Sequence, residues 1–442
     1  KGFSMFPVLY DHLSEMSDSY SRFEETRKIY FRDGEVKPVG EIIYLTDLAE
    51  TMKRMARAEE AASGRGRAAG VRAARDEIFR GETARRIVDY VQENGGLLTM
   101  ADLEDAGVKE EGPVSTRYHG CDVYACGPWS QGPVIPATLN LLETCEMEAL
   151  GHNSPEYLHR FLTAMNLSFA DRERYYGDPD FVEVPLEGIL SRSYAEERAK
   201  LLARADAFGE MAPAGDPWAH QEAASGGENG APPRPQAAVP IGEPGEPAQD
   251  TSYCTVIDGE GNAFSATPSD PSHDTPFIPG VGCTVSSRGS QGWLEEGHPS
   301  AVAPRKRPRL TPNPALALRD GEIFMTFGTP GGDVQPQAML QVFLNIVDFG
   351  MLPQVAVEAP RVTSYNFPNS FWPHAYNPGR TIAEERICRE SGEALRGRGY
   401  KLEEVPDFAR MLGSVCCIVR DPESGVLMGG ADARRASHAA GW

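Results

Sequence analysis

The feature that most constrains the fold is a long tract near the middle of the chain that has few large apolar side chains. Residues 223–247 consist mainly of Gly, Pro, Ala and Glu. Such a tract cannot bury enough apolar surface to offset the entropy lost when it is ordered. We therefore expect a flexible linker over residues 205–250, with folded regions at 1–204 and 251–442 on either side of it.

The region before the linker is predicted to be mainly helical, with short strands. Apolar residues recur at spacings of three and four over residues 43–57 and 68–94, as they do on one face of a helix. Residues 131–150 and 154–176 are further helix candidates, and residues 122–126 are a short strand candidate.

The region after the linker is predicted to begin with a β-hairpin. Residues 253–257 and 262–267 have strand-like composition and flank the turn sequence Asp258-Gly-Glu-Gly261. Further strands are predicted at 315–318, 323–326 and 414–419, and helices at 335–348, 352–359 and 383–398. Strands followed by a helix and then by more strands predict a layered α+β fold in which helices cover sheets.

Thr251 stands at the abrupt change from linker to strand, directly after Asp250. Cleavage of the bond between them would place a free α-amine beside the Thr251 hydroxyl. A terminal amine has a pKa of about 8 and can act as the base for a neighbouring hydroxyl. One residue would then supply both nucleophile and base. The alternative is an ordinary threonine that opens a strand.

A second motif, Gly328-Thr-Pro-Gly-Gly-Asp333, lies between a predicted strand and a predicted helix. Consecutive glycines before a helix allow backbone N–H groups to converge on an anion or on a developing oxyanion. A phosphate-binding loop or a plain turn would have the same composition. No Lys-Ser or Lys-Thr pair follows the glycines, which disfavours a Walker-type site.

Together these motifs resemble the gamma-glutamyltranspeptidase family, in family order over nearly all 442 residues. The matching segments downstream of the linker are Asp250-Thr-Ser-Tyr253, Val256-Ile-Asp258, Gly261-Asn-Ala263, Lys306-Arg-Pro308, Thr311-Pro-Asn-Pro314, Gly328-Thr-Pro-Gly-Gly332, Glu358-Ala-Pro-Arg361 and Gly430-Ala-Asp432. Upstream they include Ala101-Asp-Leu103, Ala170-Asp-Arg172 and Gly177-Asp-Pro-Asp-Phe181.

The resemblance implies an α+β fold of the N-terminal nucleophile hydrolase type, a four-layer αββα sandwich, and self-cleavage between Asp250 and Thr251. It assigns Thr251 as the nucleophile and Ser269 as the hydroxyl that hydrogen-bonds it. Gly331 and Gly332 match the backbone donors of the oxyanion hole. The resemblance implies no cofactor and no metal, and a heterodimer of the two self-cleaved pieces.

The residues with which the family binds a glutamyl group are not matched. Residues 285–293 hold no carboxylate where the family has acidic side chains for the α-amino group. Arg309 and Leu310 stand where the family has two serines for the α-carboxylate. The asparagine that follows the family's second threonine is replaced here by the region Asp270-Pro271. The family's N-terminal block is also unmatched, so we expect an N-terminally incomplete fold that a missing segment, a partner chain or a higher oligomer completes.

These departures bear on the substrate. Arg288 and Arg309, together with Thr267, are candidates for binding an anionic or neutral acyl group, and structural pairing is the alternative for both arginines. The predicted function is that of an amidohydrolase or acyltransferase acting on a small, non-glutamyl amide. Alternatives are a true gamma-glutamyl hydrolase or transpeptidase acting on glutathione-like substrates, an uncleaved non-catalytic relative, and an enzyme with Cys254 as nucleophile.

Composition excludes other classes. With 64 acidic and 43 basic residues the net charge is -21, which disfavours nucleic acid as a partner. No apolar run reaches the roughly 18 residues that a membrane span needs. The eight cysteines form no zinc-type pairs. Neighbouring Cys416 and Cys417 are predicted to point to opposite faces of a strand and to remain free thiols. Free thiols do not identify the cellular compartment of the protein.

Overall fold

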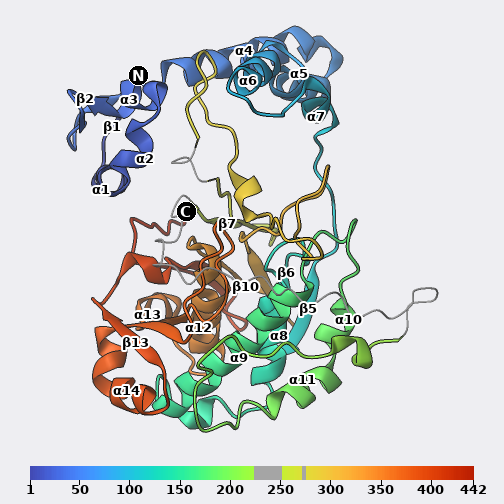
Figure 1. The fold of residues 1–442 in the computed structure, drawn as a ribbon, viewed down its shortest axis with the longest axis vertical. Coiled ribbons are helices and arrows are strands. Elements are labelled where there is room, and N and C mark those ends of the chain that lie inside the picture. The colour runs from blue at the N-terminus through green and yellow to red at the C-terminus, as the bar shows by residue number, and fades with distance from the viewer. Residues whose placement is uncertain (223–250, 271–274) are drawn as a thin grey trace. The chain divides into compact units, whose positions relative to one another are not determined.

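The computed structural model describes residues 1–222, 251–270 and 275–442. The chain forms two compact units: unit 1 comprises residues 1–110 and 270–287, and unit 2 comprises residues 111–269 and 288–442. The chain therefore leaves unit 2 after Ser269 and returns to it at Arg288. Figure 1 shows the fold and labels many of the helices and strands of both units.

Unit 1 consists of helices and very short strands. Its small apolar core contains Met5, Leu13, Tyr20, Phe31 and Ile43. The elements are β1 Phe3–Ser4, α1 Pro7–Glu15, α2 Ser17–Ser21, α3 Glu24–Tyr30, β2 Phe31–Arg32, β3 Glu35–Val36, β4 Ile42–Ile43, α4 Thr46–Ala62, α5 Arg67–Phe79, α6 Glu82–Glu93 and α7 Met100–Asp105. Helices α4 and α5 pack against each other as a helical hairpin.

Residues 68–94, where the apolar spacing indicated helix, form two helices, α5 and α6, with a break between them. The break falls at Gly81, whose backbone is extended with ψ −159°. A Cβ atom at Gly81 would lie 2.7 Å from the carbonyl oxygen of Glu77, so a larger residue would not fit this close approach. Glycine also weakens helices because it loses more backbone entropy than other residues on ordering.

Unit 2 is organised around a six-stranded antiparallel sheet with strand order β15-β14-β10-β9-β6-β5. Its strands are β5 Val114–Tyr118, β6 Cys121–Ala125, β9 Ala315–Arg319, β10 Glu322–Gly328, β14 Cys416–Arg420 and β15 Leu427–Ala431. A smaller sheet contains β11 Val362–Ser364, β12 Arg380–Glu384 and β13 Lys401–Val405. The strands predicted at 122–126, 315–318, 323–326 and 414–419 are confirmed within two residues at either end.

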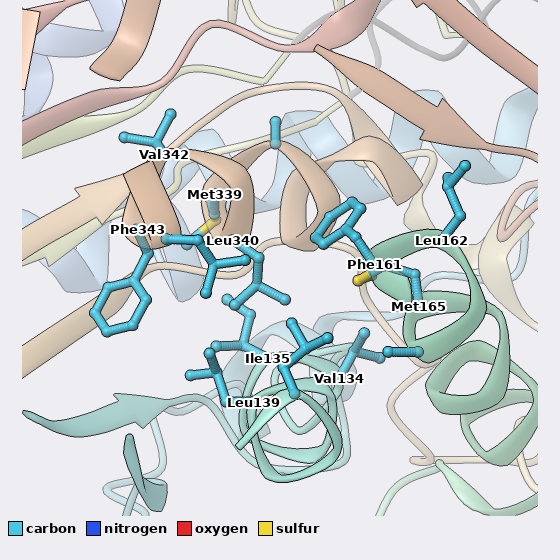
Figure 2. Close-up of a cluster of buried hydrophobic side chains, with 14 of the residues drawn as sticks. Val134, Ile135, Leu139, Phe161, Leu162, Met165, Met339, Leu340, Val342 and Phe343 are labelled. Atoms are coloured by element: carbon cyan, nitrogen blue, oxygen red, sulfur yellow. The ribbon is translucent and has the colours of Figure 1, made fainter. Parts of the chain in front are cut away.

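Helices cover one face of the large sheet. Val123, Ala317, Met325 and Val419 lie opposite one another across four neighbouring strands, and all four are buried on this face. The helices of unit 2 are α8 Val134–Leu142, α9 Pro155–Tyr175, α10 Leu186–Ile189, α11 Arg192–Ala199, α12 Gln335–Val347, α13 Pro353–Glu358 and α14 Glu385–Gly397. Figure 2 shows side chains of α8, α9 and α12 meeting in this core.

A two-stranded hairpin, β7 Cys254–Ile257 and β8 Ala263–Ala266, lies on the other face of the sheet. Phe327 stacks on Phe343 of α12 with ring centroids 5.6 Å apart. The neighbouring Thr326 accepts a hydrogen bond from Thr255 of β7 at 2.6 Å. Since successive strand residues point to opposite faces, helices, sheet and hairpin are stacked in that order.

Residues 205–222, the first part of the predicted linker, are packed as part of unit 2. Ala212 is buried, and Asn366 donates hydrogen bonds to the carbonyl oxygens of Phe208 and Glu210. The remainder of the predicted linker, 223–250, lies outside the described residues. All eight cysteines are free thiols, as predicted for Cys416 and Cys417. None of the described helices has the length and apolarity to cross a membrane.

Candidate active site

Thr251 and Ser269 lie at the open end of the hairpin. In the β7–β8 register, Cys254 pairs with Ala266. If this register is continued by three residues, Thr251 stands opposite Ser269. The pairing does continue beyond the strands, because the Ser252 N–H donates to the Pro268 carbonyl oxygen at 2.9 Å. The Thr251 Oγ1 and Ser269 Oγ atoms are 2.6 Å apart. Thr251 is 5% exposed, and Ser269 is half-buried.

Arg288 approaches the same pair from the turn 288–291, where the chain re-enters unit 2. Its Nη2 donates a hydrogen bond to Ser269 Oγ. Its Nη1 donates to Gln291 Oε1 at 3.0 Å and to Thr311 Oγ1 at 3.2 Å. The guanidinium carbon lies 5.3 Å from the centre of the Phe371 ring. Arg288 therefore binds side chains of the protein itself.

The glycine motif follows β10 directly and begins the approach to α12. Gly331 has φ +130° and Gly332 has φ +56°, conformations that L-residues with side chains rarely adopt. The Gln131 Nε2 atom donates to the carbonyl oxygens of Gly332, at 2.8 Å, and of Thr311, at 2.7 Å. These bonds set the orientation of the glycine peptide.

Tyr253 joins the hairpin to the glycine motif. Its ring lies so close to Gly328 that a Cβ atom there would be 2.2 Å from Tyr253 Cε2. The Tyr253 hydroxyl is bonded to Ser265 Oγ of β8 at 2.8 Å. Gly328 thus allows the strand that follows Thr251 to lie against the end of β10, where the glycine turn begins.

A small hollow borders the two glycines. Half of its lining residues carry aromatic rings or side-chain amides: it is lined by Gly331, Gly332, Asp333, Val334, Tyr365, Phe367, Asn369, Phe371, Ala375 and Asn377. Asp333 is the charged member among these residues. Its carboxylate accepts bonds from Arg172 at 2.5 Å and from the backbone and hydroxyl of Ser370 at 2.9 and 2.6 Å.

A buried ionic network lies behind this hollow. Arg172 donates to Asp333 and, through Nη2 at 2.5 Å, to Glu173. Arg309 donates to Glu173 at 2.8 Å and to the Arg172 carbonyl at 3.1 Å. Burial raises the pKa of the Glu173 carboxyl, but Arg309 and Arg172 outweigh that effect and the net pKa is lowered. Arg309 is 2% exposed, so its guanidinium serves this network.

Two histidines of unit 2 stack on Trp293, with ring centroids 4.1 Å away for His298 and 3.9 Å away for His374. Burial and the neighbouring Arg309 lower the pKa of His298 to about 2, and burial lowers the pKa of His374. A group with a pKa as low as that of His298 is a poor general base at neutral pH. Both rings are buried and pack against Trp293.

The remaining predicted site residues are placed as follows. Thr267 is buried, and its Oγ1 has no hydrogen-bond partner among the described residues. Cys254 is exposed at the start of β7. Asp250 lies outside the described residues. Sequence reasoning did not select Gln131, Gln291 or Phe371, because no local pattern distinguishes a buried amide or ring that touches a site from one that only packs.

Comparisons with known proteins agree with one another. The family model described as gamma-glutamyltranspeptidase matches residues 1–442. The chain is 30% identical over 434 residues to the glutathione hydrolase-like YwrD proenzyme of Bacillus subtilis (strain 168), covering 97% of this chain and 72% of that protein. It is 31% identical over 363 residues to the acylase ACY 1 proenzyme of Pseudomonas sp. (strain SE83), covering 80% and 56%.

Two solved structures share most of the architecture. Cephalosporin acylase from Bacillus halodurans matches with a TM-score of 0.81 at 26% identity, covering 100% of this chain and 72% of that one. A structure of LmbA2991HD matches with a TM-score of 0.86 at 31% identity, covering 98% and 74%.

Proposed function

The chain belongs to the gamma-glutamyltranspeptidase family, and we propose that it is an amidohydrolase that makes its own nucleophile by cleaving the bond between Asp250 and Thr251. Family membership confirms the resemblance predicted from the motifs. The structural matches confirm the predicted fold class, the αββα sandwich of N-terminal nucleophile hydrolases. The enzyme class follows: a hydrolase or acyltransferase like gamma-glutamyltranspeptidase.

The observation that carries the proposal is the pair of hydroxyls formed by the buried Thr251 Oγ1 and the half-buried Ser269 Oγ, 2.6 Å apart. A hydroxyl on the first residue of a cleaved strand has a base available in its own α-amine. His298, whose pKa is lowered to about 2, binds a proton too weakly to compete for this role. Cys254, the alternative nucleophile, is exposed at the start of β7.

Self-cleavage begins with attack of Thr251 Oγ1 on the carbonyl carbon of Asp250. The C–O bond forms, the C–N bond breaks, and the hydroxyl proton passes to the departing nitrogen, which leaves an ester. Water then hydrolyses the ester, giving a carboxylate on Asp250 and an α-amine and hydroxyl on Thr251. The chain becomes two pieces, 1–250 and 251–442, which we expect to remain together as a heterodimer.

In turnover the Thr251 hydroxyl attacks the substrate carbonyl while its α-amine takes the proton. The tetrahedral oxyanion is held by backbone N–H groups of Gly331 and Gly332. The amide C–N bond breaks as the leaving amine takes the proton from the α-ammonium. Water, deprotonated by the same amine, then splits the acyl ester and frees the acid. Backbone donors of this kind contribute about 3 to 4 kcal/mol each to the transition state.

Gly331→Ala is expected to lower kcat by about 100-fold, because φ +130° is strained for alanine and relaxation would turn the oxyanion donor away. The matched control is Gly321→Ala. Gly321 also has a left-handed backbone, φ +82°, but it lies in the turn between β9 and β10, with open space where the Cβ would be. Steady-state kinetics on purified variants measures the effect. A similar loss of kcat in both variants would count against the assignment of Gly331.

For the substrate we propose an uncharged, non-glutamyl acyl group. The guanidinium groups of Arg288 and Arg309 bind partners within the protein. The hollow beside the glycines presents rings and amides, and the carboxylate of Asp333 is satisfied by Arg172 and Ser370. A glutamyl α-ammonium placed there would lose its hydration without gaining a carboxylate partner, which is costly.

A panel of four 4-nitroanilides tests this substrate class. We expect kcat/KM for phenylacetyl and hexanoyl anilides to exceed that for gamma-glutamyl anilide at least about tenfold, since an unpaired buried charge opposes binding. Glutaryl anilide tests whether an arginine accepts an anionic acyl group. Release of nitroaniline is measured, with Thr251→Ala protein as the blank. Faster turnover of the gamma-glutamyl anilide would favour the alternative of a true gamma-glutamyl enzyme, and a protein intact at 250–251 would favour the non-catalytic alternative.

A further inference from the structure

Arg288 is tied to the nucleophile through one intervening hydroxyl. Its guanidinium donates to Ser269 Oγ, and Ser269 Oγ lies 2.6 Å from Thr251 Oγ1. Arginine has only donors, so Ser269 Oγ must be the acceptor in the first bond. The hydroxyl proton of Ser269 then remains available for the Thr251 oxygen when that oxygen becomes electron-rich.

The position of the Arg288 guanidinium is set by residues on its other side. Gln291 and Thr311 accept from Nη1 at 3.0 and 3.2 Å, and the Phe371 ring packs against it. Gln291 also donates to Thr311 at 3.4 Å. Arg288 is 8% exposed, so the positive charge is poorly screened by solvent.

We propose that Arg288 is a positioning residue for Thr251: it orients the Ser269 hydroxyl toward the Thr251 oxygen and stabilises the charge that develops there during attack. This inference rests on the proposed function, with Thr251 as nucleophile. It extends that function by giving Arg288 a role in both reactions that begin with attack by Thr251 Oγ1, namely self-cleavage and turnover. It also replaces the expectation that Arg288 binds the acyl group of the substrate.

The two roles differ in what they do to self-cleavage, which uses no external substrate. A residue that only binds substrate would leave self-cleavage unchanged and would act on KM. A residue that acts through Ser269 would slow self-cleavage and would lower kcat with little change in KM. The rate of self-cleavage therefore distinguishes a substrate-binding role of Arg288 from a positioning role.

The proposal is tested with the variants Arg288→Gln and Arg288→Lys. Arg420→Gln, which also removes one positive charge, is the matched control. Arg420 is a partly exposed arginine on β14 whose nearest carboxylate, on Glu322, is 3.9 Å away. Self-cleavage is followed on denaturing gels after synthesis in a cell-free system, and kcat and KM are measured on fully cleaved protein. Arg288→Gln is expected to slow both self-cleavage and kcat by about 10- to 100-fold, the range of one charge-assisted hydrogen bond. Arg288→Lys should recover part of the loss, and Arg420→Gln should behave as the wild type.

A double-mutant cycle with Ser269→Ala tests whether Arg288 acts on Thr251 through the Ser269 hydroxyl. If Arg288 acts through Ser269, Arg288→Gln should reduce kcat much less in the Ser269→Ala background than in the wild type. The proposal is overturned if Arg288→Gln cleaves itself at the wild-type rate, if only KM rises, or if the two changes are additive. It is also overturned if lysine rescues neither rate and both Arg288 variants melt at lower temperature, which is the result for a purely structural role. Wild-type protein that stays intact at 250–251 would instead refute the proposed function.

Discussion

Replacing Thr251 with alanine is expected to abolish both self-cleavage and amide hydrolysis. The variant should migrate as one full-length chain on a denaturing gel, and its hydrolytic rate should fall at least about a thousandfold. The Ser269 hydroxyl oxygen lies 2.6 Å from that of Thr251, but Ser269 does not directly follow the proposed cleavage site, so it has no free α-amine to act as its base. On the same preparation, a denaturing gel measures the extent of self-cleavage, N-terminal sequencing identifies the new terminus, and anilide hydrolysis measures the catalytic rate.

Ser252→Ala is the matched control for this change, because Ser252 carries an exposed hydroxyl one residue further along the chain. It should cleave and turn over at nearly the wild-type rates. Two fragments from Thr251→Ala, with a new terminus at residue 251, would refute Thr251 as the agent of cleavage. Activity that survives in Thr251→Ala and disappears in Cys254→Ala would identify Cys254 as the nucleophile.

The second large effect is expected for stability. Arg172→Met should lower the free energy of unfolding by about 3 to 5 kcal/mol, the usual result of removing one member of a buried ion pair. Arg172 is fully buried, bonds to Asp333 and Glu173, and packs 4.4 Å from the centre of the Phe169 ring. Methionine keeps part of this packing but leaves two buried carboxylates short of a cation.

The measurement is denaturant-induced unfolding of the Thr251→Ala background, in which the chain is expected to stay covalently intact. Arg192→Met is the matched control: Arg192 pairs with Glu196 on the surface of α11, where such a pair contributes about 0.5 kcal/mol or less. A loss below about 1 kcal/mol for Arg172→Met would contradict the stabilising role of the network.

In cleaved protein the same variant tests how the two pieces are held together. Arg172 belongs to the piece before residue 250, and Asp333 belongs to the piece after it. Asp333 directly follows Gly331 and Gly332, so a displaced Asp333 would also disturb the proposed oxyanion donors. We therefore expect lower kcat in Arg172→Met together with easier separation of the pieces in mild denaturant, measured by gel filtration.

Much of the local structure could be predicted from the sequence. The hairpin from 253 to 267 follows from two strand-like segments around a turn at 258–261, and its register brings Thr251 opposite Ser269. Strands β6, β9, β10 and β14 were found from short apolar runs between turns. The helical spacing at 68–94 did not locate the break between α5 and α6, because apolar periodicity continues through Gly81 whereas the helical backbone does not.

The sequence by itself determined the family, the fold class and the two segments on which the proposed chemistry depends, because these are read from contiguous motifs and from periodicities that local backbone geometry imposes. Only the tertiary structure decided what the arginines bind. Arg288 meets Ser269 where the chain returns to unit 2, and Arg172 meets Asp333 across 161 positions of sequence. Such contacts depend on which faces of the elements pack together. The sequence around a charged side chain does not identify a partner that is distant along the chain.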